Sequence, residues 1–181
     1  MEEIAQLSDD VYEQIKDFDH GELTEEQESL IDKLIPDEEF KDCYKGYGLC
    51  NECKQPKNND DWCRICVFQR NFKNWSSGND DVDKFIQKAQ LKAKYTWYTL
   101  EWIEHDRFEN IEYLAKGGFG TVYKAIWKDG YILRWEDNRW KRLGKGQVAL
   151  KCLHYSQSIM AEFLREVRNF FYNFLMILSL C

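Results

Sequence analysis

The second half of the chain contains the run Lys116-Gly117-Gly118-Phe119-Gly120-Thr121-Val122-Tyr123-Lys124-Ala125. Its glycines separate two segments with strand character. Residues 108–115 alternate between apolar and polar side chains, and residues 121–127 are rich in β-branched and aromatic side chains. A lysine follows in a third predicted strand, within Val148-Ala149-Leu150-Lys151. A glycine-rich turn between two strands, combined with a lysine on a third strand, can hold nucleotide phosphates.

Other glycine-rich devices fit this context less well. A dinucleotide-binding fold or a P-loop needs a helix directly after its glycines, whereas a strand is predicted here, and no Gly-Lys-Ser/Thr triplet is present. A purely structural hairpin stays open as an alternative. The nucleotide interpretation is favoured by the lysine strand at 147–153 and by a predicted helix at 158–168 that carries Glu166.

Composition and charge restrict the class of protein. With 181 residues and 44% hydrophobic content, the chain can form one or two small soluble domains. Its acidic start excludes a secretion signal, and the apolar segment 170–181 is too short to span a membrane. Residues 1–42 hold 16 acidic and 3 basic side chains, a net charge of −13, whereas the remainder is basic. We therefore expect a cytoplasmic protein that binds neither nucleic acid nor membrane, and whose acidic helices are either solvated or face a basic partner.

Residues 1–42 are predicted to form an acidic helical hairpin. Apolar residues recur at helical spacing from Ile4 to Phe18, and Gly21 suits the end of that helix. The run Thr24-Glu25-Glu26-Gln27 indicates a capping box before a second helix that ends near Pro36. Such a pair needs another element to cover its apolar side.

Residues 43–75 contain two cysteine pairs, Cys50/Cys53 and Cys63/Cys66, on either side of a polar turn. Two Cys-x-x-Cys knuckles complete a tetrahedral sulfur site suited to zinc, so we predict a small zinc-ribbon-like module. Disulfides, a redox site around Trp62-Cys63-Arg64-Ile65-Cys66, and buried cysteines without metal remain as alternatives. The absence of a secretion signal argues against disulfides, so Cys43, Cys152 and Cys181 are expected to be free thiols.

The expected organisation has five parts and is of the α+β class. After the helical hairpin and the cysteine module, residues 76–105 form a helical and aromatic linker, with a helix predicted over 80–94. Residues 106–169 form an antiparallel sheet with one helix, and residues 170–181 are an apolar tail. Within the sheet, residues 131–143 are predicted to be an inserted hairpin with its turn at Asp137-Asn138.

Residues 106–169 resemble the N-terminal lobe of a protein kinase. The Gly-Gly-Phe-Gly-Thr-Val-Tyr-Lys-Ala run is similar to tyrosine-kinase-like and receptor-like kinases. Together with the cysteine pairs, the Asn-Phe-x-x-Trp-x-Ser-Gly-Asn segment and Glu-Trp-Ile, it resembles a large fungal group of such kinases. The resemblance implies phosphoryl transfer from ATP to Ser/Thr or Tyr of protein substrates or signalling partners.

The resemblance also implies the role of individual residues. Lys151 would hold the α- and β-phosphates of ATP. Glu166 would pair with that lysine, and Glu162 is the second candidate for this role. Val122 and Ala149 would sandwich the adenine, with Phe119 at the tip of the loop. The complete implied nucleotide-binding set is Leu114, Lys116, Gly117, Gly118, Phe119, Gly120, Val122, Ala149 and Lys151.

Two departures from the family pattern limit what the chain is expected to do. Ala115 replaces the first loop glycine, and no His-Arg-Asp, Asp-Phe-Gly or Ala-Pro-Glu segment follows Lys151. Magnesium would therefore bind only in a full-length relative, and ATP binding by this chain would be weak or lost. We expect a truncated, inactive ATP-binding lobe. The competing hypothesis is a non-catalytic interaction protein built on the zinc module, with a vestigial lobe.

Overall fold

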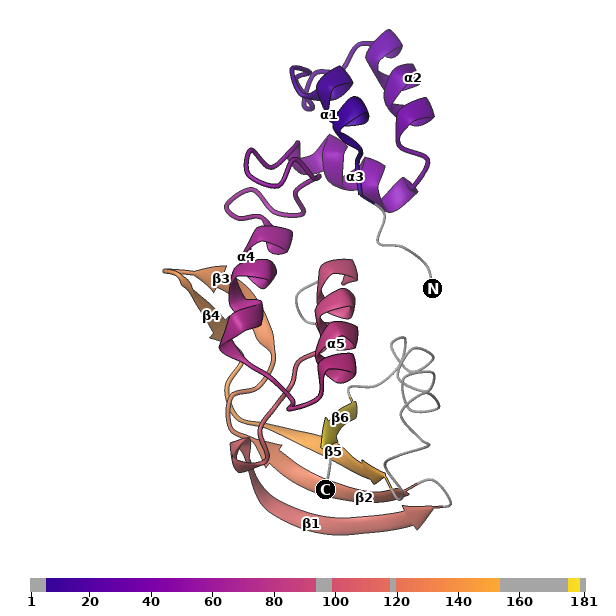
Figure 1. Ribbon diagram of the computed structural model, residues 1–181. Helices are drawn as coiled ribbons and strands as arrows, with labels where there is room; N and C mark the ends of the chain where they lie inside the picture. The colour runs from indigo at the N-terminus through magenta and orange to yellow at the C-terminus, as the bar shows by residue number, and fades with distance from the viewer. Residues whose placement is uncertain (1–5, 94–98, 118–119, 154–175, 180–181) are drawn as a thin grey trace. The chain divides into compact units, whose positions relative to one another are not determined.

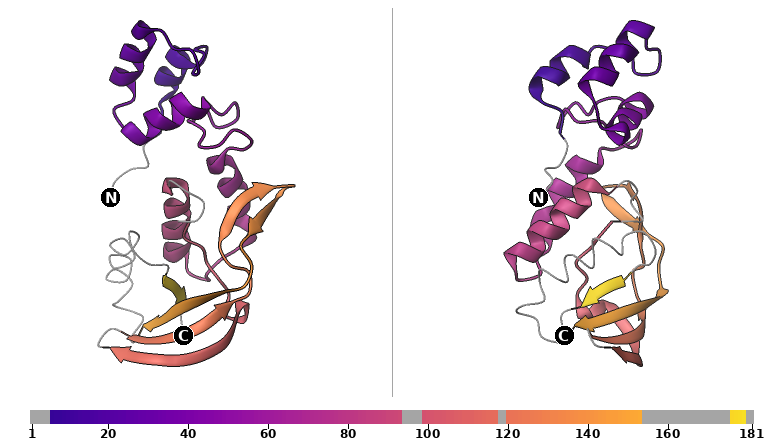
Figure 2. Two further views of the ribbon diagram at one scale, coloured as in Figure 1. Left: turned by 180° about the vertical axis from the view of Figure 1, so that it is seen from behind. Right: turned by 90° about the vertical axis from the view of Figure 1, so that its right-hand side faces the viewer.

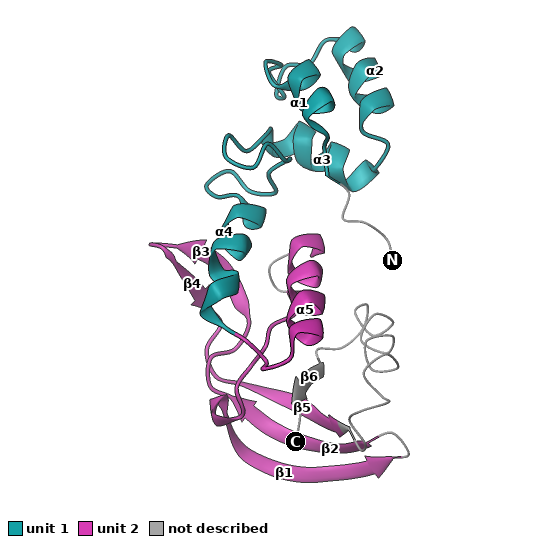
Figure 3. Ribbon diagram, in the orientation of Figure 1, with its two compact units in different colours: residues 1–75 teal, residues 76–181 magenta. Residues whose placement is uncertain are grey.

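The computed structural model describes residues 6–93, 99–117, 120–153 and 176–179 (Figure 1). The chain divides into two compact units, Met1–Trp75 and Ser76–Cys181 (Figure 3). The first is built from helices and the second mainly from strands, so the expected α+β class is confirmed. Among the described residues, every helix is too short or too polar to cross a membrane.

Three helices form the first half of unit 1, namely α1 (Asp9–Ile15), α2 (Glu25–Leu34) and α3 (Glu38–Tyr47). Each begins at a side-chain cap. The predicted capping box at Thr24 is confirmed, because its hydroxyl accepts from the Gln27 amide and the Gln27 side chain accepts from the Thr24 amide. The helices enclose a small core of four fully buried side chains, Ile15, Ile31, Ile35 and Tyr44.

The expected helical pair is in fact a three-helix arrangement. Helix α1 ends at Ile15, well before Gly21, and α3 runs across the boundary expected between residues 42 and 43. Helix α3 supplies the missing cover for the apolar side of the pair, because the Tyr44 hydroxyl donates to the Ile15 carbonyl at 3.0 Å. Helix α3 was not predicted because its sequence contains a glycine and few apolar residues. The one local signal for it is Asp37, a residue type that favours the start of a helix.

The remainder of unit 1 holds the cysteine pairs. A loop closed by an isolated bridge between Leu49 and Pro56 carries the first pair. The second pair lies at the start of α4 (Arg64–Asn71), which continues into the short 3-10 helix η1 (Phe72–Asn74). The two predicted cysteine pairs therefore differ in local structure, because a loop provides one pair and a helix N-terminus provides the other.

Unit 2 begins with α5 (Asp80–Lys92), which confirms the helix predicted there, and reaches the sheet through η3 (His105–Arg107). Strands β1 (Phe108–Gly117), β2 (Gly120–Trp127) and β5 (Gly146–Leu153) pair antiparallel, as expected. They lie side by side in both views of Figure 2. Strand β6 (Met176–Ser179) pairs with β5 in parallel. The predicted antiparallel sheet is therefore confirmed for β1, β2 and β5, and residues 176–179 of the predicted apolar tail add a parallel edge strand in the order β1-β2-β5-β6.

The inserted hairpin is confirmed. It consists of β3 (Ile132–Glu136) and β4 (Arg139–Arg142), which form a separate two-stranded sheet between β2 and β5 in the chain. Asp137 and Asn138 have φ angles of 53° and 56°, the left-handed values that a tight hairpin turn of this length requires. The rings of Trp135 and Trp140 pack edge to face across the strands, with centroids 4.8 Å apart.

The core of unit 2 lies on one face of the main sheet. Its buried members are Phe108, Ala125, Trp127, Val148 and Leu150. A part-buried ion pair lies beside this core, where Arg142 on β4 binds both carboxylate oxygens of Glu101 and also donates to the Gly130 carbonyl at 2.9 Å. The Arg142 guanidinium additionally lies 5.7 Å from the centroid of the Trp127 ring. The segment before β1 is thereby fixed to the inserted hairpin.

Candidate metal centre and candidate nucleotide-binding face

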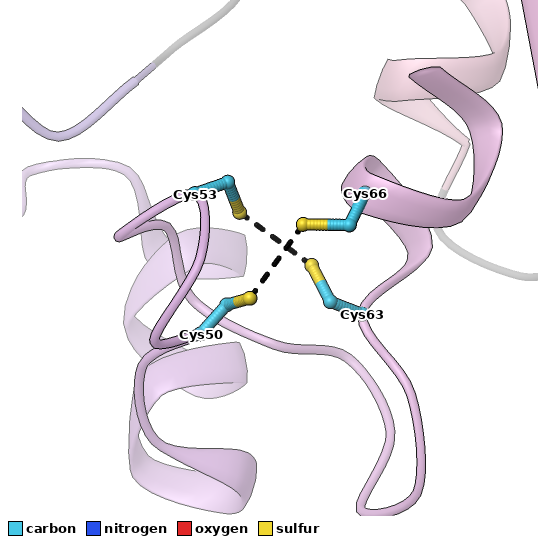
Figure 4. Close-up of side chains that lie close together, drawn as sticks. All are labelled: Cys50, Cys53, Cys63 and Cys66. Atoms are coloured by element: carbon cyan, nitrogen blue, oxygen red, sulfur yellow. Dashed lines mark hydrogen bonds between the residues drawn. The ribbon is translucent and has the colours of Figure 1, made fainter. Parts of the chain in front are cut away.

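Four cysteine sulfurs converge in unit 1. The Sγ atoms of Cys50, Cys53, Cys63 and Cys66 all lie within 4.8 Å of one another (Figure 4). The Cys50–Cys66 and Cys53–Cys63 pairs are each 3.6 Å apart. A tetrahedral zinc site with Zn–S bonds of about 2.3 Å requires sulfurs about 3.8 Å apart. The four thiols could therefore hold a metal ion such as zinc with little rearrangement.

Backbone hydrogen bonds shape the first pair. The Cys50 amide donates to the Gln55 carbonyl and the Lys54 amide donates to the Cys50 carbonyl, both at 2.9 Å. These bonds close the loop tightly and turn both thiols to the same side. Closure places Lys54 at a φ of 61°, a left-handed conformation that glycine adopts more readily.

Helix α4 positions the second pair. Cys63 is its N-cap residue and Cys66 lies in its first turn, so both sulfurs lie near the positive end of the helix dipole. Burial lowers the pKa of the Arg64 guanidinium, and the charges of Cys43, Glu39 and Cys63 oppose that shift. A guanidinium near the cluster would offset part of the net negative charge of a metal held by four thiolates.

The thiols interact strongly even without a metal. Hydrogen bonding with Cys53 lowers the pKa of the Cys63 thiol to about 5, and the same interaction raises the pKa of Cys53. Burial, followed by the charge on Cys63, raises the pKa of Cys66 to about 12. These shifts favour a Cys63 thiolate beside protonated Cys53 and Cys66, and a bound cation would take the place of those protons. The geometry favours a metal site over the disulfide interpretation for these four residues, which are free thiols.

The register of β2 and β5 places three of the predicted nucleotide residues together. Val122 pairs with Lys151, and Lys124 pairs with Ala149. Residues directly opposite on antiparallel strands share a face, as do residues two apart on one strand. Val122, Ala149 and Lys151 are therefore on one face, whereas the buried Ala125, Val148 and Leu150 are on the other. The first three are half-buried rather than enclosed in the core.

The predicted glycine loop lies at the end of the same strands. Gly117 pairs with Gly120 and Lys116 pairs with Thr121, at the ends of β1 and β2. Leu114 is exposed at an irregularity in β1, next to Ala115, which pairs with Val122. Gly118, Phe119 and Glu166 lie outside the described residues.

Three features of these sites were not predicted from the sequence. Lys124 lies on the same face of the sheet as Val122 and Lys151. Its spacing of two residues from Val122 along the strand is the sequence signal that could have indicated this. The Gln55 side chain binds the backbone of Leu7, a contact between residues 48 positions apart with no local signal. Cys152 is disulfide-bonded, so the expectation of a free thiol there is wrong.

Comparison with known proteins gives one partial similarity. No family model matches the chain, and no solved structure matches it. The chain is 39% identical over 69 residues to cysteine-rich receptor-like protein kinase 2 from Arabidopsis thaliana. The match covers 36% of this chain and 10% of that protein, so the chain spans about a tenth of its relative. The similarity indicates a kinase-related chain.

Proposed function

We propose that unit 2 is a nucleotide-binding lobe of the protein kinase type and that unit 1 is a module stabilised by one zinc ion. In a kinase, such a lobe contributes the loop above ATP and the lysine that binds its α- and β-phosphates. Here Lys151 would bind phosphate, and Val122 and Ala149 would contact the adenine. The partial similarity to a receptor-like kinase supports the proposal.

One observation carries the nucleotide part of the proposal, namely the common face of Val122, Ala149 and Lys151. A structural glycine hairpin would need no lysine on the third strand and no small side chain opposite the second. In this sheet the lysine is directly opposite Val122, and Ala149 leaves room for a flat ring two residues further along. The face is also turned away from the hydrophobic core, so a ligand could reach it.

The expected affinity is low. The described part of unit 2 offers one sheet face and no opposing wall, so a bound nucleotide would bury only part of its surface. We expect a Kd no tighter than about 1 mM, equivalent to about −4 kcal/mol. Because the residues that hold magnesium in kinases are absent from this sequence, the affinity should be the same with and without magnesium.

Titration of ATP into the isotope-labelled full chain, followed by NMR chemical shifts, tests the proposal. Shift changes should concentrate on β2 and β5 and should weaken in Lys151→Met. Lys145→Met is the matched control, because Lys145 precedes the same strand but is exposed and pairs with Glu109. Shift changes confined to unit 1, or an equal loss in both variants, would show that the face does not bind nucleotide.

The alternative function, a non-catalytic interaction protein, is favoured by unit 1. Its helices have their own buried core, and residues 1–42 carry a net charge of −13. This hypothesis predicts no ATP-dependent shift changes in unit 2, so the titration discriminates between the two.

A further inference from the structure

The first cysteine pair is attached to the N-terminal segment by two side chains that directly follow Cys53. Gln55 is buried, with 8% of its surface exposed. Its Oε1 accepts from the Leu7 amide at 2.7 Å and its Nε2 donates to the Leu7 carbonyl at 3.2 Å. The amide thus satisfies both backbone groups of one residue, as a neighbouring strand would.

Lys54 makes the second attachment. Its ammonium lies 3.2 Å from Asp9 Oδ1 and 5.0 Å from the centroid of the Tyr12 ring, and both partners belong to α1. The left-handed backbone of Lys54, which the closed cysteine loop imposes, determines where this side chain and that of Gln55 emerge. Both attachments therefore depend on the same closed loop that presents Cys50 and Cys53.

The attached segment controls the start of α1. Ser8, which caps α1 by accepting from the Val11 amide, lies between Leu7 and Asp9. Leu7 and Val11 also pack against the four-residue core of the helices. A loop that loses its metal would lose the geometry of residues 53–55, and with it the four contacts that position the cap and the first turn of α1.

We propose that Gln55 and Lys54 couple metal binding at the cysteine cluster to the docking of residues 7–15. This inference rests on the metal site proposed above. Coupling between two sites is reciprocal. If bound metal stabilises the attachment, then a variant that weakens the attachment also binds metal more weakly. Gln55→Ala should raise the zinc Kd about tenfold, equivalent to about 1.4 kcal/mol. The exposed Asp9–Lys54 pair is weaker, so Asp9→Ala should raise it about threefold.

Hydrogen exchange of the full chain, with one equivalent of zinc and after chelation, tests the coupling directly. The amides of α1 should lose protection when zinc is removed, whereas those of β2 and β5 should not change. Zinc affinity is measured in parallel by competition with a chromophoric chelator. Asp10→Ala is the matched control for Asp9→Ala, since it removes the same charge from the same helical turn without touching Lys54. The comparison of Asp9→Ala with Asp10→Ala also tests the coupling if Gln55→Ala does not fold.

The outcomes separate the two proposals. Loss of α1 protection on chelation, with weaker zinc binding in Asp9→Ala than in Asp10→Ala, supports the coupling. Zinc that binds and leaves without changing α1 protection overturns the coupling and leaves the metal site standing. A chain that binds no zinc at all overturns both.

Discussion

Replacement of Arg142 by methionine should strongly destabilise unit 2. Arg142 binds both oxygens of Glu101, whose side chain is only 13% exposed, and donates to the Gly130 carbonyl. Methionine has a similar length but no guanidinium, so it leaves the Glu101 carboxylate without its partner and removes the cation–π contact with Trp127. Removing one member of a buried pair typically costs about 3–5 kcal/mol, and because the Arg142 side chain is 28% exposed we expect a loss of about 3 kcal/mol. For a unit of this size the midpoint of thermal unfolding should fall by about 15 °C.

The loss should also depend on pH. Burial raises the pKa of Glu101, and the pairing with Arg142 opposes that rise. Without the arginine the folded-state pKa rises further, so the folded protein binds a proton more tightly than the unfolded chain. The variant therefore keeps more of its stability below the unfolded pKa of about 4.3 and loses it as the pH rises towards the higher folded value.

Urea unfolding of wild type and Arg142→Met at pH 4.5 and pH 7.5 measures both effects. Glu101→Gln/Arg142→Met is the control, because it removes the charge that Arg142→Met leaves unpaired, and it should recover part of the lost stability. A loss below about 1 kcal/mol at pH 7.5, or a greater loss at pH 4.5 than at pH 7.5, would refute the reasoning.

Two further predictions concern the backbone and the chemistry. Gly130→Ala should cost about 3 kcal/mol, because its φ is 66° and a Cβ would lie 2.0 Å from the Gly144 carbonyl oxygen. Gly78→Ala, with a φ of 78° but open space around it, should cost only about 1 kcal/mol, and equal losses in thermal unfolding would argue against the clash. These 181 residues by themselves should transfer no phosphate from radiolabelled ATP, because they lack a catalytic loop aspartate. Turnover that Lys151→Met abolishes would contradict this.

Local signals predicted much of the fold. The capping box at Thr24, the α5 helix and the turn at Asp137-Asn138 follow from residues close together in sequence, and the structure confirms all three. The spacing of the four cysteines likewise predicted the cluster. In each case the contacts that decide the conformation are within a few residues, so the sequence pattern suffices.

Long-range contacts account for what was missed. Helix α3 forms although its own residues favour a helix weakly, because Tyr44 fills the core between α1 and α2. Strand β6 has no distinctive local pattern and gains its conformation by pairing with β5. The Gln55–Leu7 contact joins residues 48 positions apart. No short-range signal encodes partners at such distances.

Zinc content of the full chain purified under reducing conditions tests the proposed metal centre of unit 1 most directly. Plasma emission spectrometry should find one zinc per chain in the wild type and in Cys43→Ser, since Cys43 is not one of the four clustered cysteines. Cys63→Ser should lose most of its zinc, because the site then lacks one of its four sulfur ligands. Substoichiometric zinc in the wild type that stays unchanged in Cys63→Ser would contradict the account.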